Sequence, residues 1–304
     1  MAYNSKVYKV ITDKILELLK DGVIPWNKPW DASMGMPKNL VTKYPYRGIN
    51  VIILSAMPYK SPWWLSYKQV KQLGGRIKDE ELKRYTPVVF FKWFERDKPK
   101  DKSDNKDGDE DLSEESKNPK KRRFPVVRYY NVYNTDQCTG LDDKIPVVEA
   151  RTDLNPIEEC EKVVENMPQR PDIHHKGNRA FYSPSMDYIQ LPVVKSFNSM
   201  EEYYSTKFHE MLHSTGHESR LNRAGIVENH FFGDEDYSKE ELVAEMGASF
   251  LCAMTGIENR TIENSASYIQ NWSKKLEDNE KWVVIAGAQA QKAVDFIMNR
   301  KKDN

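Results

Sequence analysis

The amino-acid sequence predicts an α+β protein with two domains, a mixed α/β domain in residues 1–143 and a second domain in residues 150–304. A chain of 304 residues is long enough for two packed cores, because typical domains have about 100–200 residues. A hydrophobic content of 39% and an aromatic content of 11% are those of a folded chain. Helix-like and strand-like segments alternate along its length, and we place the junction near residues 143–155.

The first domain is predicted to open with a helix over residues 7–19, which Asp21 and Gly22 close. Strand-like runs at 86–94 and 124–133 follow later. The segment between them, residues 97–123, is nearly free of apolar residues and holds 9 basic and 9 acidic side chains. Such a segment buries too little surface to fold alone, so we predict a disordered charged loop inside the first domain.

The second domain is predicted to begin with a helix over residues 155–166, because Pro156 stands at its first turn. Residues 179–192 have the pattern of a β-hairpin that turns at 183–187. A capping box, Ser199 with Glu202, predicts that a helix starts near Met200, and Gly216 would end it. A further helical segment runs through residues 238–251.

The net charge of zero hides an asymmetry between the two halves of the chain. Residues 1–96 hold 17 Lys and Arg against 8 Asp and Glu, a balance of 17 − 8 = +9. Residues 124–304 hold 20 against 29, a balance of −9. The basic half suits a polyanionic partner, whereas the acidic half disfavours direct contact with DNA. Ordinary solvated surfaces can also differ by this amount, which is the plainer interpretation.

Aromatic and basic residues alternate between residues 26 and 71 of the first domain. Single-stranded nucleic acid stacks its bases on exposed rings while cations follow its phosphates. We therefore predict single-stranded DNA as a partner, with Tyr46, Arg47, Trp63 and Lys68 as contacts. Trp63 and Trp64 are adjacent, so at most one of them is expected to face outward. No pattern of a reader of double-stranded DNA is apparent.

Residues 209–213 read His-Glu-Met-Leu-His, which is the H-E-x-x-H core of zinc hydrolases. On a helix, His209 and His213 leave the same face one turn apart, so both imidazoles can reach one metal ion. Glu210 lies at the edge of that face, where it can act as a general base. The plainer alternative is a pair of half-buried surface histidines on an amphipathic helix.

A catalytic zinc site needs a third protein ligand and an open position. His217 is a poor candidate, since it lies beyond Gly216 and about 12 Å from His209 along a helix. Glu241 and Glu245 are better, because they share one face of the next helical segment. One of them can bind the metal while the other orients a histidine, and Glu241 ranks first. The alternative role for Glu241 is to complete a capping box with Ser238.

The sequence resembles ArdC-type antirestriction proteins of plasmids, conjugative elements and phages along nearly its whole length. Residues 209–223, HEMLHSTGHESRLNR, resemble the metallopeptidase-like domain of that family. The other matching segments are EELVAEMGASFL at 240–251, ASYIQNW at 266–272, AQAQKAV at 288–294, IPWNKPW at 24–30, YRGIN at 46–50 and SPWWLSY at 61–67. Residues 97–123 lie outside the resemblance.

The resemblance implies a single-stranded-DNA-binding domain joined to a zincin-like metallopeptidase domain. Zn²⁺ would then be held by His209, His213 and Glu241, since Glu241 to Glu245 fits the Glu-x-x-x-Asp/Glu pattern of related glutamate-type zincins. Glu245 would be the positioning partner or the alternative ligand, and Glu210 the catalytic base. It also implies that residues 182–191 border the cleft, where Tyr182 or Tyr188 could assist catalysis or simply fill the core.

The implied role is protection of incoming mobile DNA from host restriction. Its partners would be single-stranded DNA and a protein substrate, such as a host restriction or DNA-processing protein. The alternative is a non-enzymatic, single-stranded-DNA-binding protective protein whose metal site is structural or vestigial. An intact Glu210 argues against that alternative, because a structural site needs no general base. A third hypothesis is an accessory module of DNA primases, to which similar N-terminal domains are fused.

The sequence predicts a cytoplasmic protein without a membrane partner. The apolar runs, such as residues 51–54, are far too short to span a bilayer, and the first residues lack the core of a signal peptide. Cys138, Cys160 and Cys252 are scattered without metal-binding spacing, as expected in a reducing compartment.

Overall fold

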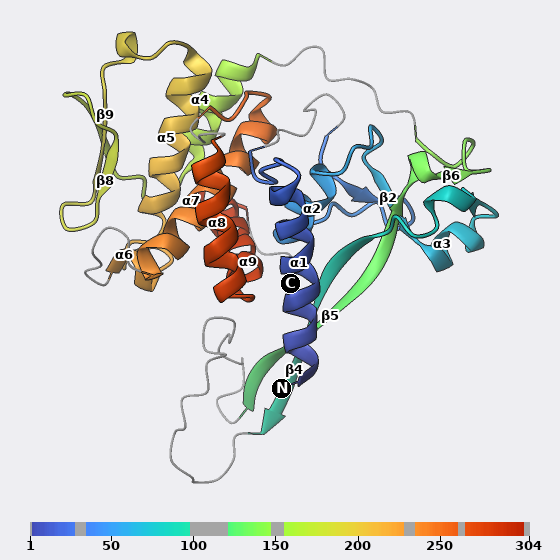
Figure 1. Cartoon of the computed structure of the whole chain (residues 1–304). Helices are drawn as coiled ribbons and strands as arrows, with labels where there is room; N and C mark the ends of the chain where they lie inside the picture. The colour runs from blue at the N-terminus through green and yellow to red at the C-terminus, as the bar shows by residue number, and fades with distance from the viewer. Residues whose placement is uncertain are drawn as a thin grey trace.

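The structure is a computed structural model, and it describes residues 2–27, 35–97, 121–146, 155–227, 235–260 and 265–300. Helices and strands are mixed, as predicted, and the chain has the two-domain α+β architecture. The helices of the C-terminal half stand together on one side of α1, and most strands of the N-terminal half lie on the other side (Figure 1).

The N-terminal half is built around a four-stranded sheet with the order β1-β2-β5-β4. Its elements are α1 (Ala2–Lys20), β1 (Lys38–Asn39), α2 (Ile49–Ser55), β2 (Trp63–Ser66), α3 (Tyr67–Gln72), β3 (Arg76–Ile77), β4 (Thr86–Asp97), β5 (Lys121–Asn134) and β6 (Cys138–Thr139). β3 and β6 form a separate two-stranded sheet. The predicted first helix is confirmed, and Gly22 after it has a φ of 77°, which favours glycine.

The two predicted strand runs form a long antiparallel hairpin, β4 with β5 (Figure 1). Pairing runs from Thr86 opposite Val132 to Asp97 opposite Lys121. The strands therefore extend into both ends of the segment predicted as a loop, because backbone pairing needs no apolar side chains. Residues 98–120 of that segment, like residues 147–154 at the predicted junction, lie outside the described residues.

The C-terminal half is mainly helical, with a small sheet of order β7-β9-β8 beside it. Its elements are α4 (Pro156–Asn166), β7 (Asp172–His175), β8 (Phe181–Ser183), β9 (Tyr188–Leu191), α5 (Met200–Ser214), α6 (Ala224–Val227), α7 (Glu235–Thr255), α8 (Ala266–Asp278) and α9 (Trp282–Ile297). The predicted hairpin is β8 with β9, which pair antiparallel. Asn155 caps α4, and Pro156 opens it as predicted.

The two ends of α5 differ in detail from the sequence patterns. Ser199 caps α5 by accepting from the backbone N–H of Glu202. The Glu202 carboxylate accepts from the N–H of Asn198, not from that of Ser199, so the predicted capping box is only half formed. Gly216 follows the helix end without a positive φ, and an added Cβ would lie 2.5 Å from Ile226. Close packing, not a left-handed conformation, requires that glycine.

The larger of two hydrophobic clusters joins the two halves of the chain, whereas the chain length suggested one core for each domain. It contains side chains of α1 and α2 together with those of α5, α7 and α9. Trp26 and Trp272 pack edge to face with ring centroids 5.9 Å apart. Gly287 of α9 lies so close to Ile49 that an added Cβ would be 2.8 Å from its backbone nitrogen. The amino-acid composition could not predict this shared cluster, because composition does not show which apolar helix faces pack against each other.

Helices α5 and α7 approach closely at Gly247. A Cβ added there would lie 2.3 Å from Cδ1 of Leu212 on α5. A real Cβ atom does not lie so close to another carbon atom. Glycine at position 247 therefore permits the observed separation of α5 and α7. Within the described residues, no helix combines the length and hydropathy needed to cross a membrane.

Gly247→Ala should lower the free energy of unfolding. Alanine favours a helix by about 1 kcal/mol over glycine, but overpacking costs about 1–3 kcal/mol, and the short distance to Leu212 lets the clash dominate. Urea denaturation in EDTA measures the change. In a Leu212→Ala background the clashing atoms are gone, so the same substitution should cost nothing more. Equal costs in both backgrounds would contradict the steric cause.

Candidate metal centre

Two histidines of α5 present their ring nitrogens to each other. Nε2 of His209 and Nε2 of His213 are 3.1 Å apart, because four residues bring them to the same helix face. His213 is 9% exposed, and His209 is somewhat more open. Nδ1 of His209 is buried and has no hydrogen-bond partner among the described residues.

Glu241 of α7 completes a cluster of three donor groups. Its Oε2 lies 3.5 Å from Nε2 of His209, and its Oε1 lies 3.4 Å from Nε2 of His213. Ligands of one tetrahedral zinc ion lie about 3.3–3.6 Å apart, given metal–ligand distances of about 2.0–2.2 Å. The three observed separations are close to that range, so the residues present fit a small divalent cation.

Ser238 stands inside α7, not at its start, so Glu241 has no capping role. The helix begins at Glu235 within the described residues, and the Ser238 hydroxyl accepts from Nζ of Lys275 at 2.9 Å. The capping alternative for Glu241 is therefore wrong. A Ser followed three residues later by Glu also occurs inside helices. Only the position of the helix start distinguishes such a pair from a capping box.

A buried ion pair holds His213 from behind. Oε1 of Glu240 lies 3.4 Å from Nδ1 of His213. Arg223 fixes Glu240 with two hydrogen bonds of 2.9 and 2.5 Å, and it also donates to the carbonyl of Leu212. A carboxylate on the far nitrogen of a ligand histidine sets its tautomer and orientation. Sequence reasoning missed Glu240 in this role, although Arg223 and Glu240 both lie in segments that carry the family resemblance.

The surrounding carboxylates determine the charge of His213. Burial alone disfavours its protonated form, but Glu241, Glu240 and Glu210 outweigh burial and raise the pKa of His213 to about 9. Burial also opposes the charged form of Glu240, yet Arg223 and His213 keep the pKa of Glu240 below its ordinary value. These carboxylates therefore favour the protonated form of His213, and a cation that binds the ring would compete with that proton.

Glu210 and Glu245 were the other carboxylates predicted for this site. Glu210 is 7% exposed on α5, and its charge contributes to the raised pKa of His213. Glu245 accepts from the hydroxyl of Tyr268 at 2.5 Å, and that hydroxyl accepts from Nε1 of Trp26 at 3.0 Å. Burial raises the pKa of Glu245 to about 7. Glu245 is not one of the three clustered residues, and the hydrogen bonds tie it to the N-terminal half.

The remaining candidates of the second domain have structural contacts. The Tyr182 hydroxyl donates to Asp187 and accepts from Arg220, and its ring is buried. Tyr188 packs against the rings of His174 and Phe181 in the small sheet. His217 lies outside the cluster, and its Nδ1 is 2.8 Å from Oγ of Ser219.

The four predicted DNA contacts lie in different environments. Tyr46 is 9% exposed, and Trp63 is 7% exposed with the ammonium group of Lys43 4.9 Å from its ring centroid. Arg47 forms an ion pair with Asp295 of α9, whereas Lys68 is exposed. Trp63 and Trp64 point to opposite faces of β2, and both faces are covered, so neither ring faces outward. The exposed rings of the N-terminal half are instead those of Tyr44, Tyr67, Tyr85, Phe90 and Tyr130 among the described residues.

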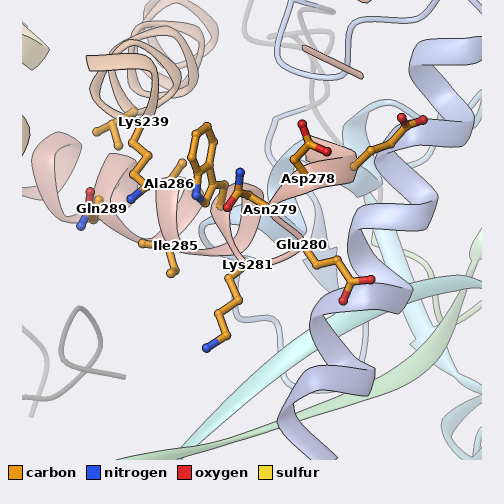
Figure 2. A pocket seen from close by; sticks show the side chains of 11 residues that line it. Lys239, Asp278, Asn279, Glu280, Lys281, Ile285, Ala286 and Gln289 are labelled. Carbon is orange, nitrogen blue, oxygen red and sulfur yellow. The ribbon is translucent and has the colours of Figure 1, made fainter. Parts of the chain in front are cut away.

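A hollow of about 570 Å³ lies between the start of α7 and the turn from α8 to α9 (Figure 2). Glu277, Asp278 and Glu280 line it together with Lys239 and Lys281. No residue of the metal cluster lines this hollow, so the hollow and the donor cluster are separate features.

Comparison with known protein families matches both halves of the chain. Residues 5–133 match the N-terminal domain of the anti-restriction factor ArdC, and residues 158–289 match the zincin-like metallopeptidase family. Two crystal structures of the antirestriction protein ArdC from the R388 plasmid are similar, both with a TM-score of 0.69. The metal-free structure is 31% identical in sequence, and the similarity covers 96% of this chain and 96% of that chain. The Mn(II)-bound one is 30% identical, with 97% of this chain and 98% of that chain covered.

Similar sequences include two DNA primases named TraC from Escherichia coli, 34% and 32% identical over 96% of this chain. The chain spans only 20% and 27% of the length of these two relatives. A protein of Sinorhizobium fredii described as uncharacterized is 28% identical, over 98% of this chain and 93% of its own length.

The affinity of the cluster for a divalent cation should rise with pH. A pKa of about 9 means that His213 binds a proton at neutral pH, and the cation must displace it. Below about pH 9 the apparent association constant should therefore rise about tenfold per pH unit for each proton released. Titration with Mn²⁺ followed by electron paramagnetic resonance between about pH 6 and 8 measures it. An affinity that does not change over this range would contradict the assigned charge state.

Proposed function

The chain belongs to the family of the antirestriction protein ArdC, and from this premise we propose that it protects incoming mobile DNA by binding single strands and hydrolysing peptide bonds at a zinc site. The observation that carries the peptidase proposal is the convergence of three donor residues from α5 and α7, whose ring nitrogens and carboxylate oxygens lie 3.1–3.5 Å apart. Two imidazoles with one carboxylate form a ligand set of catalytic zinc hydrolases.

Each residue of the cluster has a distinct part in the proposal. His209, His213 and Glu241 would hold a divalent cation, Zn²⁺ in our proposal. A bound divalent cation supplies Lewis acidity toward water and a peptide carbonyl. Glu210 takes the proton from the attacking water and returns it to the leaving amine. Glu240, held by Arg223, keeps the ring of His213 in the orientation that binding requires.

The DNA-binding part of the proposal rests on the first domain. Its residues match the N-terminal domain of ArdC, and residues 1–96 carry a charge of +9. Cations that follow a phosphate chain give affinity without sequence preference, which suits a protein that must accept any incoming strand. The protein substrate is proposed to be a host restriction or DNA-processing protein. A cytoplasmic location is also part of the proposal, and the three free cysteines are in keeping with it.

The relation to DNA primases supports DNA as the partner but not primase chemistry. The chain matches one segment of each much longer TraC protein, so the polymerising activity that the name implies belongs to those proteins as wholes. In our proposal the shared segment provides a DNA-binding surface and a metal site both in this chain and in the longer TraC proteins.

Substitution of the two carboxylates of α7 should separate the ligand from its neighbour. Glu241→Gln should lower metal affinity far more than Glu245→Gln, because only Glu241 has oxygens within 3.5 Å of both histidine nitrogens. A positioning residue typically changes affinity by about 10–100-fold, and loss of a ligand should exceed that. Metal content after dialysis against a graded chelator ranks the variants. An equal loss in both would refute the assignment of Glu241 as the sole carboxylate ligand.

Glu210→Gln should retain the metal and lose peptidase activity by roughly 10²-fold or more, because the amide keeps the shape but cannot take a proton. The measurement is the appearance of new peptide N-termini in a lysate of restriction-proficient cells, with and without single-stranded DNA. Glu218→Gln, an exposed glutamate beyond the helix end, is the matched control. Undiminished cleavage by Glu210→Gln would remove Glu210 as base. If parent and variant protect DNA equally and neither cleaves, the non-enzymatic alternative is favoured.

A further inference from the structure

A groove of about 710 Å³ crosses the N-terminal half and is separate from the metal cluster. Its walls come from the loop after β1, from α2, from the start of α3 and from the β4–β5 hairpin. The residues that line it are Asn39, Thr42, Tyr44, Pro45, Tyr46, Arg47, Asn50, Ser66, Gln69, Val89, Phe90 and Tyr130. Half of these twelve residues are apolar or aromatic, and no carboxylate belongs to the lining.

Three large rings of this groove are open to solvent. Tyr44 is 75% exposed, Phe90 49% and Tyr130 42%. Phe90 lies opposite Arg128 in the β4–β5 ladder, and Tyr130 lies two residues further along β5. Phe90, Arg128 and Tyr130 therefore project from the same face of the hairpin. Exposed rings gathered in one groove mark a surface that a ligand covers.

Cations surround these rings. Arg47 lines the groove, and the exposed Arg128 stands beside Phe90 on the hairpin. Lys43 directly precedes Tyr44, and its ammonium group is within reach of the Trp63 ring. Positive charge without a carboxylate in the lining suits a polyanion with flat apolar groups, which describes single-stranded nucleic acid.

We propose that this groove is where bases of single-stranded DNA stack, on Tyr44, Phe90 and Tyr130. The inference rests on the proposed function and assigns its DNA-binding surface to this groove. It replaces two contacts expected from sequence, because Tyr46 forms part of the groove wall with little exposed area and Trp63 is covered. Stacking needs an open ring face, and the three exposed side chains supply it.

Arg47 connects the groove with the C-terminal helix. Its guanidinium is paired with the carboxylate of Asp295 on α9. Asp295 also accepts from Nε2 of Gln291 at 3.1 Å, and Oε1 of Gln291 accepts from the N–H of Gly48 at 3.0 Å. A DNA phosphate at Arg47 therefore competes with Asp295 for the same cation.

The first test measures binding of a labelled oligothymidine of about 20 nucleotides by the full chain, using fluorescence anisotropy at low salt. Tyr44→Ala, Phe90→Ala and Tyr130→Ala should each weaken binding by about 5- to 150-fold, the range for loss of one stacked base. Tyr44→Phe should retain it, because the ring remains. Tyr85→Ala removes a ring of similar exposure outside the groove lining and should bind like the parent.

The outcomes separate this inference from the proposed function. If the parent chain does not bind the oligonucleotide at all, the proposed DNA-binding function fails. If the parent binds and all three groove variants bind equally well, the function stands and the groove is overturned. Capture of an apolar peptide by the groove without any DNA affinity would also overturn it.

The second test uses the ion pair. Asp295→Asn should tighten DNA binding by about twofold to fivefold, because the carboxylate no longer competes with the phosphate for Arg47. This factor corresponds to the free energy of a typical exposed ion pair. Asp278→Asn removes the same charge on α8, away from the groove, and controls for net charge. In an Arg47→Ala background the gain from Asp295→Asn should vanish. A gain that persists there would exclude Arg47 as the phosphate contact.

Discussion

The close contact between α5 and α7 is the constraint on which the metal centre depends. Two donors come from α5 and the third from α7, so the cluster exists only while the two helices stay at one separation. Gly247 permits that separation because a side chain there would overlap Leu212, the residue before His213. The buried pair of Arg223 and Glu240 crosses the same contact, linking the carbonyl of Leu212 to the carboxylate behind His213.

This dependence explains which parts of the site were predictable from sequence. The spacing of His209 and His213 is a local property of one helix, and it sufficed to bring their nitrogens together. Glu241 was ranked through a spacing rule and a resemblance, while its distance to the histidines is a property of two packed helices. The role of Glu240 was missed because adjacent helix residues differ by about 100° in direction. Only the position of α5 shows that Glu240 reaches Nδ1 of His213 while Glu241 reaches its Nε2. Glu245 instead contacts Tyr268, a residue 23 positions away that no local pattern connects to it.

The fold shows the same division between local and long-range information. Capping residues and strand runs predicted α4, α5 and the β4–β5 hairpin, because their signals lie within the element. The shared core was not predicted, since it depends on α1 and α9 burying faces against partners far away in the chain. The exposure of the aromatic side chains was not predictable for a related reason. A ring's residue type does not determine its exposure. Trp63 and Trp64 are buried because β2 is covered on both faces, whereas Tyr44, in the loop after β1, is exposed.

The shared core also places the groove and the metal centre on one connected set of helices. α9 holds Arg47 of the groove through Asp295 and packs against α7, which carries Glu241. Contact alone does not make the two sites communicate, because a ligand shifts an equilibrium only by its different affinity for two states. The exchange of Arg47 between Asp295 and a phosphate supplies two such states at the groove. If α7 responds to that exchange, metal binding must change DNA affinity by the same factor by which DNA changes metal affinity.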